Sequence, residues 1–164
     1  MEHKPVIEHK RVAEQSALPR ERRLNMRLMA FWWDKRADRR FPSAKDFDPE
    51  ELSDVWTHCF TLEPQDPYET SVFHYVGDSL ATISGVTEPE ITVDKIRENS
   101  LLDYATRNVP EVLSQHVPVI RSGEFQNEEG ETVMYRSILL PLSQDQATID
   151  CVVGGARCKV KRSS

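Results

Sequence analysis

Residues 132–143 (TVMYRSILLPLS) carry apolar side chains at both alternating positions of an extended chain. A strand at the solvated face of an antiparallel sheet alternates apolar and polar residues, and residues 138–142 do not alternate. The sequence therefore predicts a strand that is covered on both of its faces. The two apolar registers are Val133, Tyr135 and Leu139 on one side and Met134, Ile138, Leu140 and Leu142 on the other.

The neighbouring segments extend this strand into a small sheet. Residues 144–146 form a short polar link to residues 147–156, which are rich in β-branched and aliphatic side chains and are typical of a returning strand. Residues 119–126 predict a further strand, and residues 127–130 turn the chain into the hairpin. We expect helices on one face of this sheet and a second covering layer on the other.

The net charge of −6 is unevenly distributed along the chain. Residues 1–40 carry 11 basic and 6 acidic side chains, whereas residues 41–156 carry 6 basic and 21 acidic ones. A basic arm on an acidic body either binds that body, a second copy or an acidic partner, or is a solvated Arg-rich helix. An acidic body repels phosphate, so nucleic acid is disfavoured as a partner.

Composition also limits the class of protein. No run reaches the roughly 18–20 apolar residues that a membrane-spanning helix needs, and the first residues have no apolar stretch typical of a secretion signal. The three cysteines, Cys59, Cys151 and Cys158, have no metal-binding spacing and are odd in number. We therefore expect reduced thiols and a cytoplasmic protein.

The N-terminal part predicts a leader over residues 1–19 and a helix over about residues 20–40. Apolar side chains at positions i, i+4 and i+7 form a stripe along one face of this helix. The stripe and its margin supply the interface that we expect for a homodimer or a partner protein. These candidate interface residues are Leu24, Leu28, Phe31, Trp32 and Trp33.

The middle of the chain predicts two strands and a group of short helices. Asp48-Pro49-Glu50-Glu51 has the capping signals of a helix start. Strands are expected over residues 56–63 and 71–76, on either side of the turn-forming residues 64–67. Helices are expected over residues 79–84, ended by Gly85, over residues 93–98, and from Ser100 to about His116, where Pro110 predicts a kink or a break.

Several short motifs, in a fixed order along the chain, resemble those of a known family of domains. The motifs are Trp33, Lys35 and Arg36; Pro42-Ser43; Asp46, Asp48-Pro49 and Leu52; Phe73, Tyr75 and Gly77; Gly85; and Tyr135-Arg136 with Leu139-Leu140-Pro141-Leu142. Over roughly residues 25–156 the chain resembles PAS domains, and in particular a stand-alone PAS subfamily found mainly in alphaproteobacteria.

The resemblance implies an α+β PAS fold with a five-stranded antiparallel sheet. A helical insert between strands two and three would cover one face, and the N-terminal helix would cover the other. The chain would then consist of a leader (1–19), an N-terminal helix (20–41), a PAS domain (42–158) and a basic tail (159–164). The family implies a cytoplasmic sensory or protein-interaction module of bacterial signal transduction that is not an enzyme.

A ligand cavity in such a fold would lie between the sheet and the helical insert. The alternative is that the same side chains simply fill the core. Arg136, in an otherwise apolar strand, is expected either to bind a ligand carboxylate or to pair with Asp150, and the ion pair is favoured. The candidate lining residues are Phe60, Phe73, Tyr75, Ile83, Leu102, Leu113, Tyr135, Arg136 and Cys151.

No cofactor is assigned by the sequence. Haem is disfavoured because His116, at the end of the long predicted helix, is badly placed, and residues 77–116 have no cysteine for a flavin adduct. No glycine-rich phosphate loop or metalloprotease motif occurs. We therefore expect a module that binds a signalling protein and dimerises through its N-terminal helix. The alternative is a small-molecule sensor with an occupied core cavity.

Overall fold

The structure is a computed structural model that describes residues 20–161, with side chains from Arg23 onward. The predicted leader, residues 1–19, and the end of the predicted tail, residues 162–164, lie outside the described residues. The α-helices are α2 (Arg20–Arg36), α3 (Asp78–Ser84), α4 (Leu101–Thr106) and α5 (Val109–Gln115). The strands are β1 (Cys59–Glu63), β2 (Val72–Val76), β3 (Ile91–Thr92), β4 (Val119–Gln126), β5 (Thr132–Leu142) and β6 (Cys151–Val160).

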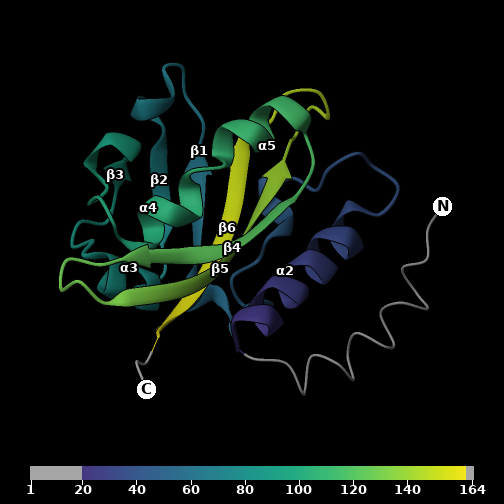
Figure 1. Cartoon of the computed structure of the whole chain (residues 1–164). Helices are drawn as coiled ribbons and strands as arrows, with labels where there is room; N and C mark the ends of the chain where they lie inside the picture. The colour runs from purple at the N-terminus through teal and green to yellow at the C-terminus, as the bar shows by residue number, and fades with distance from the viewer. Residues whose placement is uncertain (1–19, 162–164) are drawn as a thin grey trace.

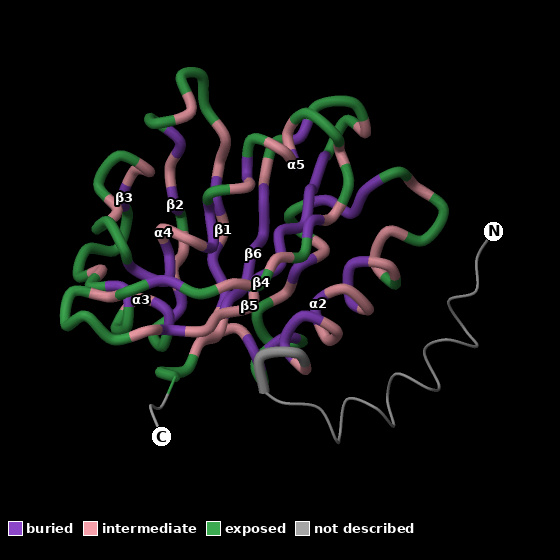
Figure 2. Tube along the Cα trace, viewed as in Figure 1, coloured by how far each residue is buried: buried purple, intermediate pink, exposed green. Residues whose placement is uncertain are grey.

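The described strands form one antiparallel sheet in the order β3-β2-β1-β6-β5-β4 (Figure 1). The long strand β6 lies in the middle of the sheet beside β1, the long strand β5 follows it, and β4 forms one edge. Residues 138–142 of β5 are all buried, which confirms that this strand is covered on both faces (Figure 2). The sheet therefore has a helical layer on each side.

The helix α2 covers one face, and Gly155 lets it approach closely. A Cβ at Gly155 would lie 2.7 Å from Cδ1 of Leu28, so any side chain here would collide with the helix. The stripe residues Leu24, Leu28, Phe31 and Trp32 are all buried. Since an apolar stripe at helical spacing must be removed from water, the sheet itself is its partner.

Two hydrogen bonds fix the direction of α2 along β5. Asn25 Nδ2 donates to the carbonyl of Ser137 over 3.2 Å, and Trp32 Nε1 donates to the carbonyl of Pro141 over 2.9 Å. The carbonyl of Pro141 therefore has a partner although it belongs to a strand packed beneath a helix, as a buried polar group requires.

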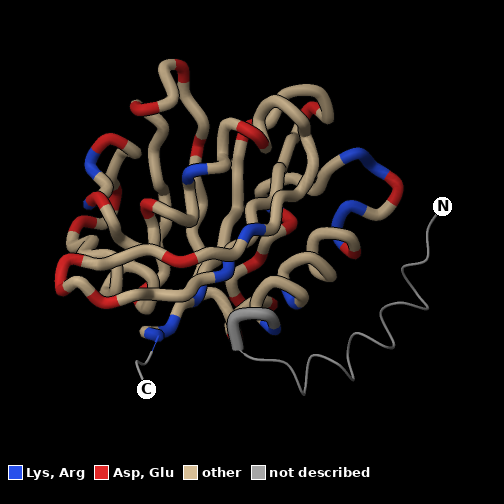
Figure 3. The backbone as a smooth tube through the Cα atoms, in the orientation of Figure 1, with Lys and Arg blue, Asp and Glu red and all other residues tan. Residues whose placement is uncertain are grey.

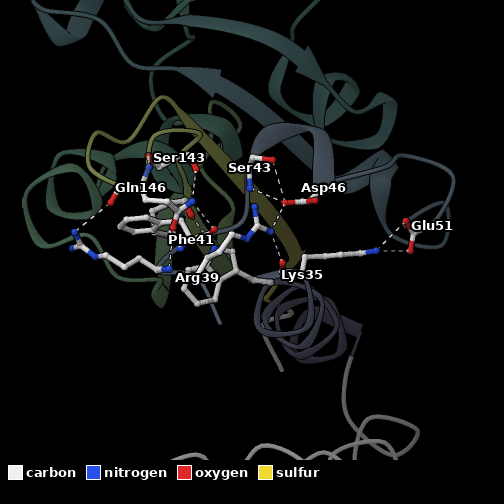
Figure 4. Close-up of polar contacts among 11 residues, drawn as sticks. Lys35, Arg39, Phe41, Ser43, Asp46, Glu51, Ser143 and Gln146 are labelled. Atoms are coloured by element: carbon white, nitrogen blue, oxygen red, sulfur yellow. Dashed lines mark hydrogen bonds and ion pairs between the residues drawn. The ribbon is translucent and has the colours of Figure 1, made fainter. Parts of the chain in front are cut away.

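The turn after α2 is tied to the loop between β5 and β6 by Gln146 (Figure 4). Its Oε1 accepts from the backbone N–H groups of Arg40 and Phe41 at 2.9 and 3.0 Å, and its Nε2 donates to the carbonyls of Phe41 and Ser143. The N–H of Ser143 in turn donates to the carbonyl of Pro42 over 2.9 Å. These bonds join segments about a hundred residues apart and make α2 a fixed part of the domain.

The insert α3–α5 lies between β2 and β4 in the chain, and α4 packs on β5 and β6. Ser100 caps α4 as predicted, since its Oγ accepts from the N–H of Asp103. Gly85 ends α3 with φ 75°, a left-handed conformation that favours glycine, which confirms its predicted role. The helix predicted from Ser100 to His116 is divided near Pro110, where α4 ends at Thr106 and α5 starts at Val109.

Several predicted boundaries are wrong. The sheet has six strands rather than five, because the two residues of β3 pair with β2. The return strand starts at Cys151, not Ala147, because the carboxylate of Asp145 accepts from the N–H groups of Ala147 and Thr148 and holds them in a polar turn. It also continues to Val160, so the predicted basic tail begins inside a strand.

The predicted helices are also shorter than expected. The N-terminal helix ends at Arg36, four residues early. Asp48 does not start an α-helix: its Oδ1 accepts from the N–H of Glu50, and residues 48–55 form successive turns instead. Leu52 is fully buried, so the helix-start signals were outweighed by packing of this loop against the core. The segment over residues 93–98 forms only a 3₁₀ turn, Val93–Lys95.

A β-bulge changes the faces of β2. Thr61 pairs with Tyr75 but Leu62 pairs with Phe73, so His74 is left out of the ladder. His74 then lies between two carboxylates, with Nε2 2.6 Å from Oε1 of Glu63 and Nδ1 3.0 Å from Oε2 of Glu90. The hydrogen bond to Glu63, followed by that to Glu90, raises the pKa of His74 above its usual value despite partial burial.

The first prediction concerns α2 as part of the core. Replacing Leu28 by Ala should lower the free energy of unfolding by about 2–5 kcal/mol, because a fully buried Leu leaves a cavity over Gly155. Urea denaturation measures the change. Replacing the exposed Asp34 of the same helix by Ala should leave stability nearly unchanged. Equal stability of the Leu28→Ala and Asp34→Ala variants would show that α2 is not part of the cooperative core.

The second prediction concerns His74. Because its pKa is raised on folding, its contribution to stability is complete below the ordinary value of 6.5 and is lost as pH rises through the folded-state pKa. The His74→Gln variant should thus be less stable than wild type at pH about 5.5 and should match it near pH 9. The gap should be under about 1 kcal/mol, since His74 is half exposed. A gap of constant size across this range in urea titrations would contradict the ion-pair origin.

Candidate functional site

The centre of the predicted cavity is filled by its own lining. Phe60, Phe73 and Leu102 have no exposed surface, and the rings of Phe60 and Phe73 meet edge to face at 5.4 Å between centroids. A Cβ at Gly154 would lie 2.2 Å from Cζ of Phe60, so the ring occupies the space that a side chain on β6 would take. These three predicted lining residues belong to one packed core.

Beside this core, β4, β5 and α4 share an aromatic cluster. Tyr104 stacks on Phe125 at 4.4 Å, and Tyr135 lies 5.7 and 5.9 Å from these two rings. The guanidinium of Arg107 lies 3.8 Å from the centre of the Tyr104 ring, on the outer side. Burial raises the pKa of the Tyr135 phenol. The sequence indicated Tyr135 but not Tyr104 or Arg107, whose positions in α4 and at its end carried no signal of their own.

Three predicted lining residues lie on the other face of the sheet, beside α2. Arg136 and Cys151 share the alternation of Ile138, Val153 and Gly155, the register that faces α2. Tyr75 reaches this face through the bulge at His74, and its hydroxyl donates to the carbonyl of Trp56 over 2.9 Å. Burial raises the pKa of both Tyr75 and Cys151 to about 12. The sheet thus separates these three residues from Phe60, Phe73 and Leu102.

The ion pair expected between Arg136 and Asp150 is wrong. Arg136 pairs with Arg157 on β6, whereas Leu142, at the far end of β5, pairs with Cys151. Six residues of strand separate Arg136 from that end, a distance of about 20 Å. The Asp150 carboxylate instead accepts from the N–H of Gln144 over 2.8 Å. A hairpin with the predicted three-residue link would already place Asp150 opposite Leu140, four positions from Arg136, and the longer loop moves Asp150 beyond the end of β5.

The last two predicted lining residues lie at the edges of the insert. Leu113 on α5 is partly buried against the core. Ile83 on α3 is 51% exposed and lines a surface pocket of about 350 Å³. This depression, which we call the hairpin pocket, lies where α3 and the start of α4 meet the β4–β5 turn and the end of β6. Its polar rim includes Arg97 and Glu128, which the sequence did not single out because they are 31 residues apart in the chain.

The predicted interface residues divide into two groups. Leu24, Leu28, Phe31 and Trp32 are buried inside their own chain, whereas Trp33 is half-buried. The Arg36 guanidinium lies 4.3 Å from the centre of the Trp33 ring. Trp33, Arg36 and the half-buried Met29 form what we call the α2 flank, the side of the helix turned away from Arg27 and its partner Asp54. Figure 3 shows basic residues along α2 and the turn after it, and acidic residues over the insert and the β4–β5 turn.

The arrangement offers little for catalysis. Residues 23–161 bring no three His, Cys, Asp or Glu side chains together in a way that would hold a metal ion. Burial raises the pKa of the Cys59 thiol well above its usual value, so this cysteine is a poor nucleophile. His116 adopts a left-handed conformation after α5, and its ring packs edge-on against Phe41 at 6.0 Å. In the described part of the chain, no helix has the length and apolar character needed to cross a membrane.

Comparison with known proteins identifies one family. The model of the PAS domain family matches residues 20–156. No curated protein sequence matches the chain. Among solved structures, the chain is similar to the PAS domain of Bordetella pertussis BvgS, with 14% identity, a TM-score of 0.40, and 70% and 89% of the two chains covered. It is also similar to a PAS domain of a two-component sensor histidine kinase, with 14% identity, a TM-score of 0.38, and 67% and 99% covered.

The filled centre leads to the third prediction. Replacing Gly154 by Ala should destabilise the protein by about 1–3 kcal/mol, because the new methyl group collides with the Phe60 ring. The double variant with Phe60→Leu should lose less than the sum of the two single variants, since the smaller side chain makes room. Chemical denaturation of the four proteins measures this coupling. Additive losses would mean that the ring moves into free space, as it would if a core cavity were present.

Proposed function

Because the chain belongs to the PAS domain family, whose members are sensory signalling modules, we propose that it signals by binding another protein chain through the α2 flank. This function needs no catalytic step. We also propose membership of the alphaproteobacterial PAS subfamily and a cytoplasmic location, supported by the motifs along the chain and by the odd number of its cysteines, which have no metal-binding spacing. The coarser assignment, a sensory PAS domain, rests on the family match over residues 20–156.

Trp33 carries this proposal. Its neighbour Trp32 is buried and donates to Pro141, so it serves the fold. Trp33 is only half-buried and is paired with Arg36, and Met29 lies one turn before it on the same flank. Trp, Met and Arg are enriched at the cores of protein interfaces, where Trp and Arg dominate the binding energy. A residue of this size on a helix already anchored to the sheet indicates a second binding partner.

The partner that we propose first is a second copy of this chain, with a signalling protein bound by the dimer. The edge strand β4 supports this arrangement, because Ile120 is 47% exposed and shares the α2 side of the sheet with Ile138, its ladder partner. An apolar side chain at the strand edge would enlarge the surface of the α2 flank.

The alternative function, sensing through an occupied core cavity, receives less support. Phe60, Phe73 and Leu102 fill the centre of the insert side, and Tyr75, Arg136 and Cys151 lie across the sheet from them. A ligand in the core would need these side chains to move apart, at a cost in burial for each of them.

The fourth prediction separates binding from folding. Trp33→Ala should keep the thermal stability within a few degrees of wild type but weaken self-association at least about tenfold, as loss of an interface hot spot does. Trp32→Ala should instead destabilise the fold by about 3–5 kcal/mol. Sedimentation velocity over a concentration series measures association, and thermal unfolding measures stability.

Ile83→Lys is the control, because Ile83 is a large apolar residue, 51% exposed, that lies on α3 and outside the α2 flank. It should associate like wild type. A wild-type protein that sediments as a monomer at every concentration would contradict self-association through the α2 flank. Equal association of wild type and Trp33→Ala would place the interface elsewhere.

A further inference from the structure

The hairpin pocket gathers apolar surface that the fold leaves in water. Four large apolar side chains are markedly exposed in the described part of the chain, and two of them, Ile83 (51%) and Val160 (44%), line this pocket. They come from α3 and β6, and the buried Leu101, Phe125 and Val133 lie between them. Apolar surface collected in a concave site is typical of ligand binding, whereas isolated exposed residues are not.

The rim of the pocket carries both signs of charge. Arg97 and Lys159 are basic, and Glu128 and Glu129 are acidic. Arg97 Nη1 lies 3.9 Å from Oε1 of Glu128, and their side chains are 48% and 61% exposed, so this ion pair is long and solvated. Such a pair contributes little to the fold, and both groups keep bonding capacity for another molecule.

The fold fixes one of these charges at the pocket. A Cβ at Gly85 would lie 2.7 Å from Cζ of Arg97, so the guanidinium packs on the bare backbone where α3 ends. The positive φ of Gly85 makes a larger residue unfavourable there on backbone grounds as well. The Arg97 guanidinium therefore lies against the end of α3. Ile83, in the last turn of this helix, lines the same pocket.

We propose that the hairpin pocket binds a zwitterion with an apolar side chain, the chemistry of a free hydrophobic α-amino acid. The carboxylate pairs with the guanidinium of Arg97, whose planar fork suits a carboxylate. The ammonium group pairs with the carboxylates of Glu128 and Glu129. The apolar side chain covers Ile83 and Val160.

The composition of the pocket favours an apolar zwitterion over other classes of small ligand. An anionic amphiphile would cover Ile83 and Val160 with its apolar chain, but its negative charge would lie beside the carboxylates of Glu128 and Glu129. A cationic amphiphile would meet Arg97 and Lys159 in the same way. A zwitterion without an apolar side chain would leave Ile83 and Val160 in water. The volume of about 350 Å³ lies within the roughly 300–1,000 Å³ range of small-molecule sites.

Such a ligand would contact both halves of the domain. Arg97 and Ile83 belong to the insert, whereas Glu128 and Val160 belong to the sheet and its β4–β5 turn. Binding therefore joins the insert to the hairpin through the ligand and supplies a chemical input to the module. This input site is separate from the α2 flank and does not depend on the proposed protein partner.

Isothermal titration calorimetry of the whole chain tests the proposal with a matched set of probes. L-leucine should bind saturably. 4-Methylpentanoate lacks the ammonium group and 3-methylbutylamine lacks the carboxylate, and each should bind at least about tenfold more weakly, as loss of a charge-assisted hydrogen bond predicts. Glycine lacks the apolar side chain and should also bind at least about tenfold more weakly, because it buries less apolar area. Absence of L-leucine binding, or equal binding of 4-methylpentanoate, would overturn the proposal.

Variants locate the site. Ile83→Lys and Arg97→Gln should each weaken L-leucine binding at least about tenfold, with the melting temperature measured to establish that both variants are folded. Ile120→Lys, a change of the same kind at a similarly exposed residue outside the pocket, should bind like wild type. Unchanged binding by folded Ile83→Lys protein would overturn the assigned site. Trp33→Ala should bind L-leucine normally, so failure of the partner proposal and failure of the ligand proposal are distinguishable.

Discussion

The close approach of two layers to one strand is the constraint on which this structure depends. On β6, adjacent glycines point to opposite faces of the sheet: Gly155 admits Leu28 of α2, and Gly154 admits the ring of Phe60 on the insert side. A side chain at Gly155 would hold α2 away from the sheet, and a side chain at Gly154 would displace the Phe60 ring, which belongs to the neighbouring strand β1. The apolar β5 lies directly beside these glycines, with Ile138 paired to Gly155 and Leu139 to Gly154. On each face of the sheet, an apolar residue of β5 therefore lies opposite a glycine of β6.

This packing decides where the protein can bind other molecules. Because Phe60 and Phe73 occupy the middle of the insert side, and Trp32 is committed to the sheet, the remaining binding surface lies at the periphery. Two peripheral surfaces have the composition of binding sites: the α2 flank around Trp33 and the hairpin pocket around Ile83. They lie on opposite sides of the sheet, with the β5–β6 core between them.

The sequence was informative about which residues are buried, and much less informative about which face of the sheet each side chain lies on. Leu24, Leu28, Phe60 and Leu102 were all expected to be covered, and all are buried. Tyr75, Arg136 and Cys151 were assigned to the insert side, and the structure places them across the sheet. For Tyr75 the reason is the bulge at His74, which reverses the alternation within a single strand. For Arg136 the reason is the alternation of β5, since Arg136 directly follows Tyr135 and neighbouring strand residues point to opposite faces of the sheet.

By itself, the sequence determined that a two-sided strand would be covered on both faces, that a helix with an apolar stripe would supply one cover, and that the chain resembles PAS domains. The first two conclusions follow from hydrophobic periodicity, which is a local property of the chain, and the resemblance rests on the ordered set of short motifs. Only the tertiary structure decided which side each residue faces, that the centre is filled, and that Arg97 and Glu128 meet at a pocket with Val160. Those facts depend on pairings between residues far apart in the chain, and local sequence carries no record of such distances.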